Sequence, residues 1–264
     1  MLVQSGDIRP QWQHVLANLA STLPFLQGDA PLARPGGWAY PDMLEVGNLA
    51  NVTESRAHFA MWAVMSSPLI LSFRMTDQTR MDEVWPIITN RRVLAVNQAW
   101  AGHPGRRLAA ADAPSPPSSP PSPPPSSPPS SPPSSTAPPT HPLSSLPLPT
   151  ATLLGSAWQI WAKPLGLRSH AVLFVNTGSQ PELTLSWPLA NVSSALGAAD
   201  AACVYDLYTG RAHGPVDPRT ANLTVEALGA HDAAFWCVHA LEDVDGRARG
   251  ECDKPASRGA CPGE

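Results

Sequence analysis

A run of proline divides this chain into two parts. Between Pro114 and Pro149, 17 of the 36 residues are proline, and almost all the others are Ser, Thr, Ala, Leu or His. Such a stretch has too few large apolar side chains to offset the entropy lost on folding. We therefore expect an extended, semi-rigid spacer with polyproline character. A role in binding a partner stays open, because a tract of this kind always contains P-x-x-P triplets.

The spacer leaves two segments that are each long enough to bury a core. We expect folded units at residues 1–111 and 151–242, the spacer at 112–150, and a polar, cysteine-containing tail at 243–264. The chain has a net charge of −4 and no basic stripe, which argues against a nucleic-acid surface. No apolar run approaches the roughly 20 residues of a membrane helix. The start lacks the pattern of a signal peptide, and we interpret Met1 as a truncation point or a misassigned start.

Hydrophobic spacing in the first segment predicts alternating helices and strands. One helix is expected from Arg9 to Thr22, and a second begins at the Asn51 cap and ends at Pro68. The apolar run 69–73 predicts a strand that is buried on both faces. A third helix is expected over 76–88, with Met81, Val84 and Trp85 pointing inward. The second helix has four residues on one side that we interpret as core residues: His58, Met61, Trp62 and Met65.

After the spacer, the apolar residues recur at every second position. This period predicts short strands, and the Gly, Pro and Asn turns between them favour an antiparallel sandwich. The expected strands lie near residues 158–162, 172–176, 183–187, 204–208, 223–225 and 233–239.

All four cysteines follow the spacer, and none has the C-x-x-C spacing of a metal site. Cys203 and Cys237 lie in expected strands and could pair, while Cys252 and Cys261 could close a short loop. An even number of cysteines fits an oxidising compartment, although buried free thiols remain open. Three glycosylation triplets add weak support for secretion; they begin at Asn51, Asn191 and Asn222.

The most specific motif is Gly36–Asn48, with the sequence G-G-W-A-Y-P-D-M-L-E-V-G-N. Thirteen residues that include three glycines, a proline, a tryptophan and two acids fit neither an amphipathic helix nor a strand. The motif resembles the segment G-G-W-N-D-P-D-M-L-E-V-G-N of the family 27 glycoside hydrolases, and differs only at Ala39 and Tyr40. Three more segments are similar to that family: residues 5–8, 56–71 and 93–98.

The resemblance implies a fold and an activity. It places residues 1–111 at the C-terminal part of a (β/α)8 barrel, and residues 151–242 in the β-sandwich that follows the barrel. Members of the family hydrolyse terminal, non-reducing α-D-galactose with retention of configuration, using two carboxyl groups and no cofactor or metal. Implied partners are α-galactoside oligosaccharides or glycoconjugates. The resemblance also suggests a secreted, extracellular or vacuolar location, and leaves open whether the molecule forms a homodimer.

Asp7 is the candidate acid/base, because Ser5-Gly6-Asp7-Ile8 is similar to the family element S/T-x-D-I that holds this residue. The local alternative is a helix-capping aspartate. Val3 stands where the family usually has an arginine. Asp42, Met43 and Trp38 are the candidate substrate-binding residues, and the alternative there is a plain turn fixed by Pro41. The Ala39 and Tyr40 replacements imply an altered pocket.

The nucleophile is missing from these candidates. In the family it follows a strand of the type K-Y-D, and the only Tyr-Asp pair here, Tyr205-Asp206, falls in the expected sandwich. We therefore expect the chain alone to be inactive. Its incomplete barrel should expose strand edges, whereas the sandwich could fold alone. Two alternatives remain: an inactive relative that serves as a sugar-binding or structural module, and a related specificity for α-N-acetylgalactosamine or β-L-arabinopyranose.

Overall fold

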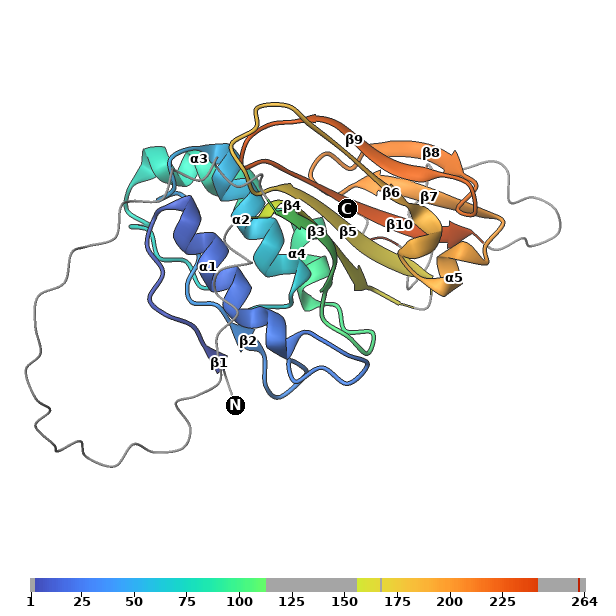
Figure 1. Cartoon of the computed structure of the whole chain (residues 1–264). Coiled ribbons are helices and arrows are strands. Elements are labelled where there is room, and N and C mark those ends of the chain that lie inside the picture. The colour runs from blue at the N-terminus through green and yellow to red at the C-terminus, as the bar shows by residue number, and fades with distance from the viewer. Residues whose placement is uncertain (1–2, 113–155, 167, 242–260, 262–264) are drawn as a thin grey trace, which may run out of the picture.

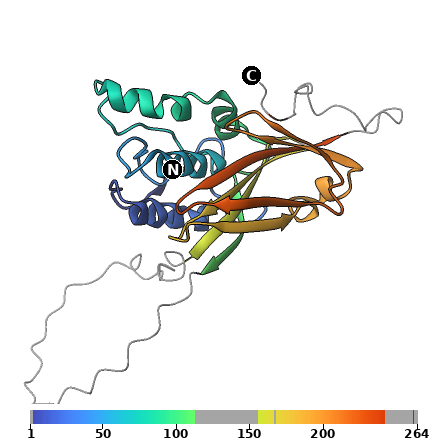
Figure 2. The same cartoon turned by 90° about the horizontal axis from the view of Figure 1, so that it is seen from above.

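The computed structural model describes residues 3–112, 156–166, 168–241 and 261. Helices α1 to α4 gather on one side of the molecule, and the strands that follow them form two sheets on the other side (Figures 1 and 2). The expected spacer and most of the expected tail lie outside the described residues. In the described ranges, no helix is long and apolar enough to cross a membrane.

The first part alternates short strands with helices, as the sequence predicts. Strands β1 and β2 are two residues each and run parallel, with Val3 opposite Ala39. The elements in order are β1 (Val3–Gln4), α1 (Trp12–Thr22), the 3₁₀ turn η1 (Leu23–Phe25), β2 (Ala39–Tyr40), α2 (Val52–Val64), α3 (Gln78–Ile88) and α4 (Arg91–Gln98). Parallel strands joined through a helix are the repeating unit of β/α folds.

Helix α2 begins as predicted but ends earlier. The Asn51 side chain accepts a hydrogen bond from the backbone N–H of Glu54, which is the expected cap. The helix ends at Val64, before Pro68. Its end is a Schellman motif: Ser66 has the left-handed φ of 59°, its N–H bonds Ala63 O, and the next N–H bonds Trp62 O. The backbone at Ser66, and not the proline, therefore terminates α2.

Two further predictions in this part are wrong. Residues 69–73 form no regular strand, because only Leu71 makes a bridge, to Leu44, and Ile70 is 47% exposed. Leu69 and Leu71 are only partly buried, so the run is not buried on both faces. Trp85 of α3 points outward and is 54% exposed, because the helix buries the face of Val84 and Ile87 instead.

The second part is an antiparallel sandwich, as predicted. Its larger sheet has the strand order β3-β4-β5-β10-β7-β8, and β6 pairs with β9 in the smaller sheet. The strands are β3 (Arg106–Asp112), β4 (Ser156–Pro164), β5 (Ser169–Asn176), β6 (Leu183–Pro188), β7 (Ala201–Asp206), β8 (Ala212–Val216), β9 (Asn222–Leu228) and β10 (Ala233–Leu241). Between β6 and β7 lie η2 (Leu189–Asn191) and α5 (Ser194–Gly197).

The expected domain boundary at residue 111 is wrong. Strand β3 begins at Arg106, before the proline run, and pairs antiparallel with β4, which follows it. No sequence pattern predicts this strand, because β3 has three alanines and no clear period of two. The sandwich therefore includes one strand, β3, that precedes the proline-rich tract, together with the strands that follow the tract.

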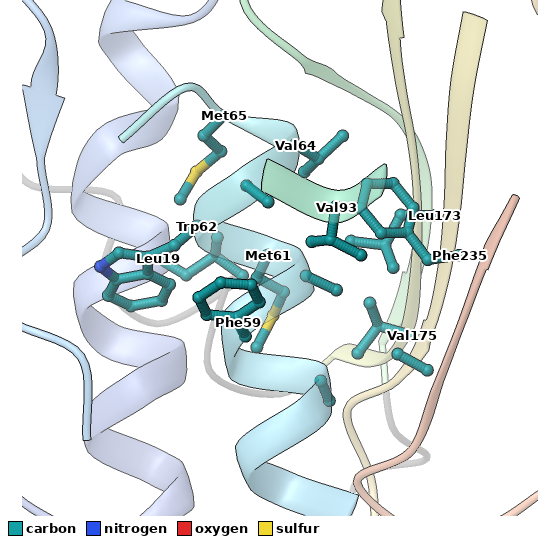
Figure 3. Close-up of a cluster of buried hydrophobic side chains, with 14 of the residues drawn as sticks. Leu19, Phe59, Met61, Trp62, Val64, Met65, Val93, Leu173, Val175 and Phe235 are labelled. Atoms are coloured by element: carbon teal, nitrogen blue, oxygen red, sulfur yellow. The ribbon is translucent and has the colours of Figure 1, made fainter. Parts of the chain in front are cut away.

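The larger sheet is covered on both faces. On one face, Leu173, Val175 and Phe235 join a core with Met61 and other residues of the helical part (Figure 3). On the other face, residues such as Phe174 pack with the smaller sheet. All eight residues of β5 are consequently buried. The sandwich thus covers part of the apolar face of the helical part.

The expected disulfide pairing is also wrong. Cys237 bonds Cys261, with the sulfur atoms 2.05 Å apart. In the register of β7 and β10, Cys203 lies opposite His239, whereas Cys237 lies opposite Tyr205. The two cysteines are therefore diagonal neighbours, whose Cβ atoms are about 7 Å apart, too far for a disulfide. Cys203 is itself disulfide-bonded, and no cysteine in the described ranges is free.

Candidate active site

The two candidate acids lie in neighbouring loops at the same edge of the β1–β2 pair. Asp7 comes three residues after β1, and Asp42 comes two residues after β2. The strands are parallel, so the loops leave the pair at the same end. The backbone N–H of Ile8 donates to Oδ2 of Asp42 over 2.8 Å. The residue after Asp7 is therefore in direct contact with the Asp42 carboxylate.

Asp42 has an unusual backbone that several contacts hold in place. Its φ of 75° lies in the left-handed region, which costs a residue with a side chain roughly 1–3 kcal/mol. Besides Ile8, the carboxylate accepts from its neighbour Met43 N over 2.8 Å. The Asp42 carbonyl accepts from the indole N–H of Trp62, on α2, over 3.0 Å. These bonds direct the carboxylate toward the Asp7 loop. A plain turn fixed by Pro41, which was the alternative, would not need them.

Asp7 is exposed, and its carboxylate makes no bond to any described residue. The alternative of a helix-capping role is wrong, because Gln11 occupies the cap position of α1 and offers no side-chain bond. An exposed carboxyl group without an intramolecular partner is free to meet a substrate. The geometry is thus compatible with the role that the resemblance implies.

Met43 and Tyr40 flank Asp42. The Met43 side chain is 38% exposed beside the carboxylate that its own N–H contacts. Burial raises the pKa of Tyr40, and the Asp42 carboxylate raises it further through its charge and a hydrogen bond. The tyrosine hydroxyl therefore lies against Asp42, at a position where the resemblance expects a second carboxylate. Tyr40 therefore places a neutral donor beside Asp42.

Among the described residues, Trp38 makes no hydrogen bond to either acid and packs on Trp100. It precedes β2, whereas Asp42 follows it, and an extended chain of that length spans about 13 Å. Its ring packs edge-on against Trp100, with the centroids 5.4 Å apart. The structure gives Trp38 a packing contact at the other end of the strand.

The second half of the Gly36–Asn48 motif holds the scaffold. The Glu45 N–H donates to Nε2 of the fully buried His58, and burial lowers the pKa of that histidine to about 3. The Asn48 side chain donates to the Glu45 carboxylate and accepts from Arg80 of α3. The prediction that His58 is a hydrogen-bonded core residue is confirmed.

Sequence reasoning missed one residue of the site. Asn18 on α1 is 6% exposed and donates to the backbone of both loops, at Gly6 and at Pro41. The available signal was an asparagine in the apolar stripe that holds Val15, Leu19 and Thr22. The described residues contain no group of three or more side chains suited to a metal ion.

Comparison with known proteins identifies the family. Residues 3–99 match the family described as alpha galactosidase A, and residues 155–238 match the alpha galactosidase C-terminal beta sandwich domain. The chain belongs to the α-galactosidase family of glycoside hydrolases. Together, the two matches place the described helical part in the catalytic barrel and the strands after it in the sandwich, which confirms the predicted fold class.

Individual relatives agree with this assignment. Alpha-galactosidase 3 of Arabidopsis thaliana is 42% identical over 236 residues, which cover 89% of this chain and 42% of that protein. The structure of the Saccharomyces cerevisiae α-galactosidase with raffinose matches with a TM-score of 0.59 and 21% identity, over 85% of this chain and 51% of that one. A family 27 β-L-arabinopyranosidase from Geobacillus stearothermophilus matches with a TM-score of 0.62 and 15% identity, over 92% of this chain and 46% of that one.

The two structural likenesses show the fold alone. The chain spans about half the length of these relatives or less.

Proposed function

We propose that this protein acts in the hydrolysis of terminal, non-reducing α-D-galactose, with retention of configuration. The observation that carries the proposal is the hydrogen bond from Ile8 to the Asp42 carboxylate. It joins the loops of two acids at one end of parallel strands, which is where β/α barrels hold their catalytic groups. Membership of the α-galactosidase family supports the substrate class.

The proposed chemistry gives each residue a separate task. Retaining glycosidases use two carboxyl groups about 5 Å apart, one as nucleophile and one as acid and then base. Asp7, exposed and unpaired, donates a proton to the leaving oxygen and later takes one from the attacking water. Asp42 accepts hydrogen bonds from sugar hydroxyls, while Met43 forms an apolar part of the pocket. Beside its two backbone donors and Tyr40, the Asp42 carboxylate keeps one lone-pair site that can accept from the sugar.

This chain supplies no candidate for the nucleophile. Asp206, the acid of the only Tyr-Asp pair, ends β7 and accepts from the backbone N–H groups of Tyr208 and Thr209. That is the role of an aspartate in a turn. The K-Y-D element that holds the nucleophile in the family is absent from these 264 residues.

Hydrolysis of p-nitrophenyl α-galactoside tests the proposal. The 264-residue chain should show no turnover, and the reading frame extended upstream to include a K-Y-D element should be active. In that extended protein, Asp7→Asn should lower kcat about 10²- to 10⁴-fold, as expected for loss of an acid/base group. Asp29→Asn, another exposed loop acid, is the matched control and should keep full activity. Full activity of the Asp7→Asn protein would refute the role of Asp7.

Two outcomes would favour the alternatives. An extended protein with no activity on any glycoside, but with measurable affinity for galactose, would indicate an inactive, sugar-binding relative. Faster cleavage of the α-N-acetylgalactosaminide or the β-L-arabinopyranoside would indicate a related specificity, and Tyr40 beside Asp42 is the observation that favours testing it.

The location and the partners are part of the proposal. The Cys237–Cys261 bond supports an oxidising compartment, such as the extracellular space or a vacuole. We infer that the substrates are α-galactoside oligosaccharides or glycoconjugates. Secretion of the tagged protein and oxidation of its cysteines, measured by thiol labelling in cells, test the location.

A further inference from the structure

One buried side chain joins the two loops that carry the candidate acids. The Nδ2 group of Asn18 donates to Gly6 O and Pro41 O, each over 2.9 Å, and to Ser5 Oγ over 3.2 Å. Gly6 is the residue before Asp7, and Pro41 is the residue before Asp42. A single amide on α1 therefore bonds the backbone immediately ahead of both acids.

The asparagine at position 18 stabilises the two loops and does not favour the helix in which it lies. Asn18 lies in the buried stripe of α1, and asparagine is a poorer helix former than the aliphatic residues around it. A buried amide also costs free energy unless it is hydrogen-bonded. An apolar residue would suit the helix better, but would leave Gly6 O and Pro41 O without this donor.

A second bond closes the link between the loops. The Ile8 N–H reaches the Asp42 carboxylate from the residue after Asp7, while Asn18 bonds the residue before it. Asp7 is thus held on both sides, and its distance from Asp42 depends on both contacts. Because each peptide carbonyl is rigidly joined to the next residue, a shift at Gly6 or Pro41 reorients the acid that follows.

We propose that Asn18 is a positioning residue that sets the spacing between the Asp7 loop and the Asp42 loop. The proposal rests on the proposed function, since it concerns the same site. Asn18 acts through the backbone and touches neither the sugar nor the reacting atoms. A misplacement of about 1 Å in a catalytic group can cost about 100-fold in rate, so such a clamp matters for catalysis.

Amide hydrogen exchange tests the clamp in the chain as it exists. Asn18→Leu keeps the volume and removes the donor, and the exchange rate of the Ile8 amide should rise about 10-fold or more. Thr22→Val is the matched control: it removes a buried hydroxyl from the same face of α1, whose partners are Leu19 O and Met65 Sδ. Its effect on Ile8 should be no larger than the change in global stability.

An equal rise at Ile8 in both variants, after correction for global stability by urea unfolding, would overturn the proposal. If Asn18→Leu fails to fold, Asn18→Asp keeps the shape and presents acceptors to three oxygens. It should raise exchange at Ile8 in the same way. Protection at Ile8 that stays unchanged in Asn18→Asp would equally contradict the clamp.

Kinetics separate this inference from the proposed function. In the upstream-extended protein, Asn18→Leu should lower kcat about 10- to 100-fold with little change in KM, while Thr22→Val should leave both constants near the parent values. A kcat for Asn18→Leu equal to that of Thr22→Val would contradict the positioning role. Absence of activity in the parent would defeat the proposed function alone, because the exchange result still decides whether Asn18 holds the loops.

Discussion

The helical part and the sandwich are held together in different ways. In the sandwich, antiparallel ladders between strands of five to nine residues pair the backbone. In the helical part, strands β1 and β2 have two residues each, so side chains must join the loops. Asn18, Asp42 and Asn48 do this through bonds to atoms far along the chain. Where side-chain contacts hold the loops of a site, substitutions can alter the site while the pairing of the strands stays the same.

The largest expected effect concerns the core that both parts share. Phe235 of β10 is fully buried against the helical part, whereas Phe174 of β5 is fully buried against the smaller sheet. Each change to alanine should cost about 3–5 kcal/mol of unfolding free energy. Tryptophan fluorescence and circular dichroism during urea unfolding should give a single, shifted transition for Phe235→Ala.

The Phe174→Ala protein is the control for that comparison. If the two parts were independent, Phe235→Ala would affect the helical part and the sandwich in separate transitions. Separate midpoints by the two probes would contradict a shared core and restore the expectation that the sandwich folds alone.

A second prediction concerns the buried cation between the two parts. Lys163 of β4 is fully buried, and its Nζ donates to Ser66 Oγ, Val96 O and Asn97 O at the ends of α2 and α4. Burial lowers the pKa of Lys163 to about 7, from 10.5. Between these two values the unfolded chain binds more protons than the native protein, so this group makes stability rise with pH. Below about pH 7, the full cost of the buried charge is present.

The Lys163→Met variant tests whether this lysine makes the stability of the protein rise with pH. The stability of the parent minus that of the variant, from urea midpoints between pH 6 and pH 10, should increase as the pH rises above about 7. Arg168→Met, at an exposed cation in the turn between β4 and β5, is the control and should give a constant difference. A difference that is flat or falls with pH would show that the native ammonium is not destabilised by burial.

The smallest expected effect concerns the start of α2. Asn51→Ala removes the cap to Glu54 N–H and should cost about 1 kcal/mol by thermal unfolding. Thr53→Ala removes the same glycosylation triplet while keeping the cap, so it controls for any glycan at Asn51. Equal losses in the two variants would mean that the cap contributes little to stability.

Much of the fold could be read from local spacing, and the failures share a cause. The cap at Asn51 and the period of two in β4, β5 and β10 depend on residues close in sequence, and these predictions are confirmed. Strand β3 has no period of two, and its partner β4 follows the spacer, so local spacing could predict neither the strand nor its pairing. Trp85 and the expected strand at 69–73 failed because burial depends on what lies opposite, which local spacing does not specify.

In the candidate site, too, local sequence predicted some features and only the tertiary structure decided others. The sequence determined that Asp7 and Asp42 belong to the motifs of a glycosidase, because motif residues are adjacent along the chain. Only the tertiary structure decided that Asp42 takes a left-handed backbone, that it bonds a residue 34 positions earlier, and that Asn18 joins both loops. It also decided that Cys237 pairs with Cys261. Contacts between distant residues depend on how helices and sheets pack, and that packing is a property of the whole chain.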